Sequence, residues 1–131
     1  MSLLLVGLSF SVSAIECKTY KTRHILKKAI VTKDEKICIS KYGGVAASSE
    51  KCSELDNKGC PFNNLKKTLE YENFVSELGS PGFNLCHHLA GSPQIYDVKI
   101  NDKWTRFERC YGKKSVEFVD INRLIQRYRA L

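Results

Sequence analysis

The fold of this chain is decided by residues 79–110, GSPGFNLCHHLAGSPQIYDVKINDKWTRFERC. The tripeptide Gly-Ser-Pro occurs twice in this stretch and marks both ends of a short helix. Ser80 is a good N-cap, and Pro81 suits the first helical position, where its missing N–H is not needed. Gly91 suits the left-handed conformation that closes a helix, and Pro93 cannot continue one. The stretch therefore predicts a helix that ends just before Gly91.

The residues after this helix change to the period of two that is typical of strands. Residues 94–100 alternate in this way, and residues 104–110 alternate again. In the second run Trp104, Arg106 and Glu108 share one face, whereas Thr105, Phe107 and Arg109 share the other. The turn-forming residues Asn101-Asp102-Lys103 lie between the two runs. The pattern predicts an antiparallel hairpin.

Cys86 lies on the apolar face of the predicted helix, and Cys110 ends the second strand of the predicted hairpin. Because the two elements are neighbours in the sequence, we expect a disulfide between these cysteines. Such a bond would contribute about 3.5 kcal/mol in the chain-entropy relation.

Residues 79–120 resemble a small domain found in short secreted or lipid-anchored bacterial proteins that often have a hemolysin label. The resemblance rests on Gly79-Ser80-Pro81, Cys86, Gly91, Cys110, Gly112 and Phe118-Val119-Asp120. It departs from that family at Lys113, Lys114 and Glu117, where a further cysteine and a tryptophan are often found. The resemblance implies a core of helix, hairpin and strand, and its label implies a membrane-active toxin, but it implies no catalytic residue.

The first 14 residues, MSLLLVGLSFSVSA, contain no charge and end in small residues, as signal peptides do. We expect a signal peptide over residues 1–14 and an exported protein, either periplasmic or extracellular. The segment is shorter than the roughly 20 apolar residues of a membrane span. We expect residues 15–131 to contain no transmembrane segment and to form a single secreted domain.

All six cysteines follow the predicted signal peptide, and an even number of cysteines in an exported chain is typical of a disulfide framework. With Cys86 assigned to Cys110, nearness in the sequence favours Cys17 with Cys38 and Cys52 with Cys60.

The remaining segments predict an α+β fold, with a small antiparallel sheet, two or three helices and disulfide cross-links. Residues 18–42 suggest two strands joined by a turn, and residues 46–51 suggest a short helical turn. Apolar residues at helical spacing predict a helix over residues 64–78. A third strand is expected over residues 115–119, and Asp120 is expected to cap a final helix whose apolar face covers the sheet.

The net charge of +7 is unevenly distributed along the chain. Residues 15–41 have a net charge of +5, residues 42–85 of −2, and residues 86–131 of +4. If the two basic ends share a face, that face would attract polyanions. The candidate anion-binding residues are Lys18, Lys21, Arg23, Lys27, Lys28, Lys113, Lys114, Arg123, Arg127 and Arg129. The alternative is that these side chains only keep an exported protein soluble.

Few residues suggest catalysis or metal binding. Cys86, His87 and His88 are consecutive, so on a helix they point about 100° apart and cannot chelate one ion together. A cysteine in a disulfide is no nucleophile, and the chain contains no G-x-S-x-G and no glycine-rich phosphate loop. Trp104 could stack on a ligand, but a strand tryptophan is more often a core residue that packs against a helix. We therefore expect no enzyme, no metal and no cofactor.

Charge, export and cysteines together favour a monomeric binding protein for an anionic polymer or lipid surface of the cell envelope. Nucleic acid is a poor partner, because the chain lacks an aromatic-basic motif for it. Two alternatives remain open: an inhibitor of a secreted enzyme, which would have a protein partner, and a membrane-active toxin.

Overall fold

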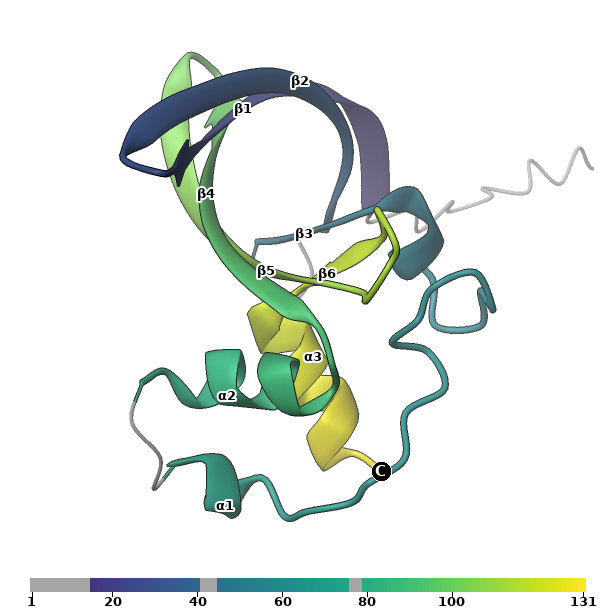
Figure 1. The fold of residues 1–131 in the computed structure, drawn as a ribbon. Helices are drawn as coiled ribbons and strands as arrows, with labels where there is room; N and C mark the ends of the chain where they lie inside the picture. The colour runs from purple at the N-terminus through teal and green to yellow at the C-terminus, as the bar shows by residue number, and fades with distance from the viewer. Residues whose placement is uncertain (1–14, 41–44, 76–78) are drawn as a thin grey trace, which may run out of the picture.

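The computed structural model describes residues 15–40, 45–75 and 79–131; the predicted signal peptide, residues 1–14, lies outside them. The described residues form a six-stranded antiparallel sheet in the order β3-β2-β1-β4-β5-β6. Its strands are β1 (Ile15–Leu26), β2 (Ala29–Ser40), β3 (Ala46–Ser48), β4 (Ser92–Ile100), β5 (Lys103–Tyr111) and β6 (Phe118–Asp120). Figure 1 shows that the strands curve round into a nearly closed barrel.

The barrel is closed where the end of β3 meets β6. The Ser49 backbone N–H donates to the Phe118 carbonyl oxygen at 3.1 Å, and the Phe118 N–H donates to Ser49 Oγ at 3.0 Å. Ser49 is buried at this contact. One residue thus joins the two ends of the sheet, which leaves less strand edge open to pairing with another chain.

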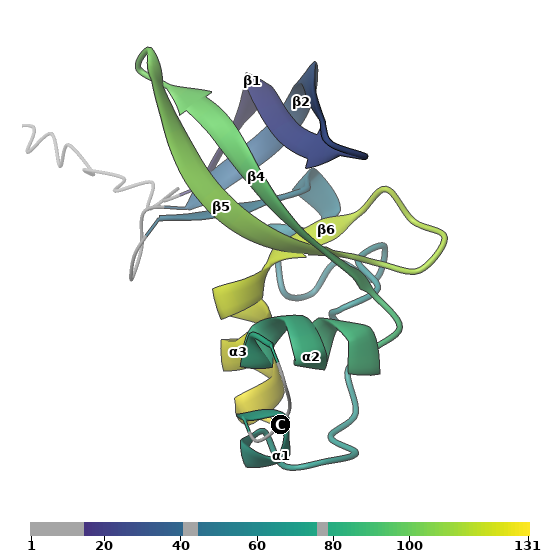
Figure 2. The ribbon, with the colours of Figure 1, turned by 60° about the vertical axis from the view of Figure 1, so that its left-hand side comes forward.

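The helices lie together beyond one end of the barrel (Figure 2). They are α1 (Glu72–Val75), α2 (Pro81–His88) and α3 (Ile121–Arg129), with a 3₁₀ turn η1 (Glu50–Cys52) after β3. Asp120 caps α3 as predicted, because its carboxylate accepts from the N–H groups of Asn122 and Arg123. Gly82 lets α2 approach α3 closely, since a Cβ there would lie 2.3 Å from Ile121 Cγ2.

The apolar residues form two clusters. One lies between the helices and the sheet and contains Leu85, Leu124 and Tyr128, none of which has any exposed surface. The other fills the barrel and contains Ile37, Tyr96 and Val98. The predicted α+β class is therefore observed, with more of the chain in strands than in helices.

All three predicted disulfide pairings are confirmed. Cys17 is bonded to Cys38, Cys52 to Cys60, and Cys86 to Cys110. The last bond joins α2 to β5, and the predicted hairpin is present as β4 and β5 in full register from Ser92↔Tyr111 to Ile100↔Lys103.

The helix predicted over residues 64–78 is wrong in its length. Only Glu72–Val75 is helical, and residues 76–78 lie outside the described part. Tyr128 Oη accepts from the Leu69 N–H at 3.0 Å and donates to the Leu69 carbonyl oxygen at 2.5 Å. The hydroxyl takes the two backbone groups that a helix would use, so a tertiary contact overrides the local preference.

Two smaller predictions are also corrected. The helical turn expected over residues 46–51 begins only at Glu50, where η1 starts, because Ala46–Ser48 form β3. The left-handed residue after α2 is Ala90, with φ of 62°, rather than Gly91. Gly91 is required by space, because a Cβ would lie 2.4 Å from Cys110 Sγ and 3.0 Å from Cys86 Sγ.

Candidate functional site

The outer face of β1, β4 and β5 presents a tryptophan with two cations on its ring. The Arg23 guanidinium carbon lies 4.2 Å from the Trp104 ring centroid, and Lys99 Nζ lies 5.7 Å from it. Trp104 is half-buried and follows directly on the β4–β5 turn, whereas the helices lie beyond the other end of the barrel. The expectation that Trp104 packs in the core against a helix is wrong, because β5 turns its Trp104 face outward.

The carboxylate of Asp97 bridges two arginines on this face. Arg23 Nε donates to Asp97 Oδ2 at 2.9 Å, and Arg106 Nε donates to Asp97 Oδ1 at 3.2 Å. Burial opposes ionisation of Asp97, but the hydrogen bonds and charges of the two arginines outweigh it and lower the pKa of this carboxyl. The carboxylate therefore stays ionised and keeps both guanidinium groups in place.

The same face has more basic than acidic side chains. Lys21 lies on it together with Arg23, because the two alternate along β1 with the buried Thr22. The Arg106 side chain is 73% exposed, and Lys21 and Lys99 are also exposed. Across β1, β4 and β5 this face presents four cations, Lys21, Arg23, Lys99 and Arg106, with Asp97 and Glu108 as its carboxylates. We call these four cations and Trp104 the Trp104 face.

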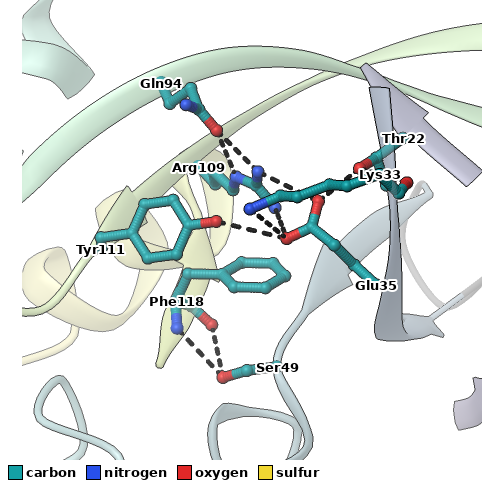
Figure 3. A network of polar contacts seen from close by, with 8 residues as sticks. All are labelled: Thr22, Lys33, Glu35, Ser49, Gln94, Arg109, Tyr111 and Phe118. Carbon is teal, nitrogen blue, oxygen red and sulfur yellow. Dashed lines mark hydrogen bonds and ion pairs between the residues drawn. The ribbon is translucent and has the colours of Figure 1, made fainter. Parts of the chain in front are cut away.

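A second charged group lies inside the barrel, where Arg109 has no exposed surface. Figure 3 shows its guanidinium between Gln94 and Glu35. Its Nη2 donates to Gln94 Oε1 at 2.6 Å, and its Nη1 donates to Glu35 Oε1 at 3.2 Å. The guanidinium carbon also lies 3.8 Å from the centroid of the Tyr96 ring. Arg109 is thus enclosed by hydrogen-bond acceptors and aromatic rings.

Glu35 is the carboxylate that balances Arg109. Thr22 Oγ1 donates to Glu35 Oε2 at 2.5 Å, and Lys33 Nζ lies 3.6 Å from Glu35 Oε1. Burial works against the charged form, but the Thr22 hydrogen bond and Arg109 outweigh it and lower the pKa of Glu35. Burial raises the pKa of the nearby Tyr111 to about 12. The network holds β1, β2, β4 and β5 together and has the character of a polar core.

A groove of about 1120 Å³ lies between the outer face of β1 to β3 and α3. Its lining carries both signs of charge: Lys36, Arg123 and Arg127 face Glu50, Glu54 and Asp120. Lys36 and Glu50 form an ion pair with each other. Among the residues of this lining that the structure describes, basic and acidic side chains are therefore equal in number.

The structure separates the ten predicted anion-binding residues into three groups. The first group lies on β1. Its Lys21 and Arg23 belong to the Trp104 face, whereas its Lys18 lies on the other face of the strand, over the Tyr20 ring. Lys27 and Lys28 form the β1–β2 turn, and Lys113 and Lys114 lie in the β5–β6 connection. Figure 2 shows both connections on one side of the barrel. The third group, Arg123, Arg127 and Arg129, lies on α3.

The α3 arginines have partners within the protein. Arg127 donates to Asn63 Oδ1 at 2.9 Å and to the Cys52 carbonyl oxygen at 3.0 Å, so it anchors the disulfide loop to α3. Arg123 donates to Ser40 Oγ at 3.3 Å, and Arg129 lies over the Tyr71 ring. These contacts stabilise the packing of α3.

No group of three or more metal-ligating side chains gathers in the described ranges. His87 and His88 are exposed on α2, and His88 Nε2 lies 2.6 Å from Thr68 Oγ1. No described helix is long and apolar enough to cross a membrane.

The sequence did not predict that Lys99, Trp104 and Arg106 form one site together with Arg23. The alternation along β5 already put Trp104 and Arg106 on one face, but it did not reveal that β1 would bring Arg23 beside them. The pairing Arg23↔Asp97 joins positions 74 residues apart. No family model, curated protein or solved structure matches the chain.

Proposed function

We propose that this chain is an exported protein that binds an anionic polymer of the cell envelope or cell surface through the Trp104 face. The observation that carries the proposal is the half-buried Trp104 ring with Arg23 and Lys99 placed on it, at 4.2 and 5.7 Å. Three disulfides fit the oxidising compartment in which such a polymer is found.

Trp104 acts as a positioning residue in this proposal. A cation over an aromatic ring is held by the ring's quadrupole, so Arg23 and Lys99 lose little further freedom when an anion binds. Asp97 places Arg23 and Arg106 beside each other in the same way. Guanidinium groups match the paired oxygens of carboxylate, phosphate and sulfate groups. The face therefore suits a chain of repeated anionic groups.

Binding is tested with immobilised dextran sulfate, with neutral dextran as the reference polymer. We expect Lys99→Gln and Arg106→Gln each to weaken binding by about fivefold, since a well-placed charge contributes about 1 kcal/mol. Trp104→Ala should weaken binding although it removes no charge, because Arg23 and Lys99 lose the ring that positions them. Trp104→Phe should keep part of the wild-type affinity, because phenylalanine still offers an aromatic ring to the two cations.

The matched control is Lys66→Gln, which removes one exposed lysine outside the sheet. We expect this variant to bind like the wild-type protein. A loss for Lys66→Gln equal to that for Lys99→Gln would mean that only the net charge matters, and equal wild-type binding to dextran and dextran sulfate would also refute the proposal.

A further inference from the structure

The tip of the β1–β2 hairpin exposes apolar side chains beside two lysines. Ile25 is 74% exposed, Leu26 is 53% exposed and Ile30 is 69% exposed. Lys27 and Lys28 form the turn between them, and both are exposed. Figure 1 shows the turn standing out from the barrel, apart from α2 and α3. Large exposed apolar residues at a projecting tip indicate a site of interaction with another protein or with a membrane.

The lysines adopt a turn conformation that does not suit them. Lys27 has φ of 49° and Lys28 has φ of 66°, as a two-residue turn of type I′ requires. Asn-Gly and Asp-Gly are the favoured residues for this turn, and the β4–β5 turn uses the tolerant pair Asn101 and Asp102 at φ of 50° and 62°. Strained residues that persist in a turn point to a role for their side chains.

Within the described part of the chain, neither lysine ammonium has an ion-pair partner; the seven pairs there join other residues. The two cations therefore remain available to an external anion.

We propose that this tip, Ile25 to Ile30, docks the protein onto an anionic lipid bilayer. Ile25 and Ile30 pair across the hairpin and face one side, whereas Leu26 and Ala29 pair and face the other. A fluid bilayer surrounds an inserted tip on both sides, whereas a flat protein surface would cover only one. Lysines next to apolar side chains fit the boundary where lipid headgroups meet acyl chains. The inference goes beyond the Trp104 face and uses none of its residues.

The test is co-sedimentation of the full disulfide-bonded protein with vesicles of phosphatidylcholine alone or of phosphatidylcholine with phosphatidylglycerol. We expect the wild-type protein to bind the vesicles that contain phosphatidylglycerol and to leave the neutral ones unbound. Lys27→Asn/Lys28→Gly should lower binding by about 25-fold, because each lysine near an anionic surface contributes about fivefold. This variant places the favoured Asn-Gly pair in the turn, so it should fold at least as well as the wild-type protein.

The apolar half of the proposal is tested with Ile25→Ser/Ile30→Ser, which leaves the charge unchanged. We expect at least a roughly tenfold loss of vesicle binding, since two exposed isoleucines would no longer be buried in lipid. The matched control is Leu55→Ser in the loop closed by Cys52 and Cys60, because Leu55 is 69% exposed, as Ile30 is. This control should bind as the wild-type protein does.

Three results would overturn the docking proposal. The first is an absence of wild-type binding to anionic vesicles. The second is equal loss for Leu55→Ser and for the isoleucine pair. The third is a wild-type dimer in vesicle-free sedimentation velocity that Ile25→Ser/Ile30→Ser converts to monomer, which would show that a second copy covers the tip. The dextran sulfate assay changes no tip residue, so either proposal can fail alone.

Discussion

Arg109 is a positive charge that folding removes completely from water. A buried ion is tolerated only where a counter-ion and hydrogen bonds replace the lost hydration. Glu35 provides the counter-ion, Gln94 provides the acceptor, and the rings of Tyr96, Tyr111 and Phe118 lie within 4.8 Å of the guanidinium carbon. The pair is therefore mutually dependent, and either member alone would be destabilising.

Arg109→Met should lower the free energy of unfolding by about 3 kcal/mol, because it leaves Glu35, whose side chain is only 14% exposed, with the more exposed Lys33 as its one remaining counter-ion. The double variant Arg109→Met/Glu35→Gln should recover part of that loss. Arg106→Met, on the outer face of the same strand, should cost less than about 1 kcal/mol. Urea denaturation at neutral pH measures all three, and a double variant less stable than Arg109→Met alone would contradict the account.

Asp120 gives the protein a dependence on pH opposite to that of a carboxylate whose pKa is lowered by folding, such as Glu35. Burial raises the pKa of Asp120 from 3.8 to about 6, although the N–H groups of Asn122 and Arg123 favour the ionised form. An acid whose pKa is raised by folding stabilises the folded state at low pH. That contribution is lost as the pH rises through about 6.

Asp120→Asn should therefore gain stability relative to the wild-type protein as the pH rises from about 4 to 7. The relative gain should approach about 3 kcal/mol, since one pKa unit corresponds to about 1.4 kcal/mol. Asparagine is also a good N-cap, so the start of α3 is retained. Thermal or urea unfolding over this pH range measures the difference, and a constant difference between the two proteins would exclude the raised pKa.

At the residue scale, the sequence predicts what depends on near neighbours. The cap at Asp120 follows from the pattern of α3, and the shared face of Trp104 and Arg106 follows from alternation. The burial of Arg109 does not follow from the sequence. Alternation places Arg109 on the same face as Phe107, but it does not show that Glu35 of another strand pairs with Arg109 there. Glu35 and Arg109 are 74 positions apart.

At the scale of elements, the junction between α2 and β4 is shaped by the Cys86–Cys110 disulfide. Gly91 lies so close to both sulfur atoms that it has no room for a side chain, while Ala90 takes the left-handed conformation in its place. A glycine is thus used for close approach, and the neighbouring alanine bears the unfavourable φ.

Substitutions at Ala90 and at Gly91 should have opposite effects on the stability of the protein. Ala90→Gly should stabilise the protein by about 1 kcal/mol, because glycine adopts positive φ without a steric cost. Gly91→Ala should destabilise it by about 1 to 3 kcal/mol through overpacking against Cys110. Each variant serves as the control for the other, and the midpoint of thermal unfolding gives the sign of each change. A gain for Gly91→Ala would contradict the assigned roles.

Elements with local signals were predictable, and elements set by distant contacts were not. The β4–β5 hairpin and α2 carry their own turn and cap residues, and each of the three disulfides joins two cysteines that follow one another along the chain. Residues 64–71 carried a helical pattern, yet Tyr128 takes the Leu69 backbone groups from a distance of 59 positions. The spacing of apolar residues within a segment cannot show that a distant side chain will bond to the backbone of that segment.

For the whole molecule, the order of strands in the sheet decides which charges share a surface. Because β1 pairs with β4 as well as with β2, cations from the first part of the chain meet Lys99, Trp104 and Arg106 from the last part. The charge distribution in the sequence suggested that both ends contribute to one face. The structure places the contribution of the last part on β4 and β5, whereas the predicted arginines of α3 have partners within the protein.

The central claim, an anionic polymer bound on the Trp104 face, is tested most directly by the salt dependence of wild-type and Trp104→Ala binding to dextran sulfate. Exposed charges are screened beyond about 8 Å at physiological salt. We therefore expect the wild-type affinity to fall steeply as salt is raised, with Trp104→Ala weaker than the wild-type protein at each concentration where binding is measurable. An affinity that does not change with salt, or one that is the same for both proteins, would contradict the account.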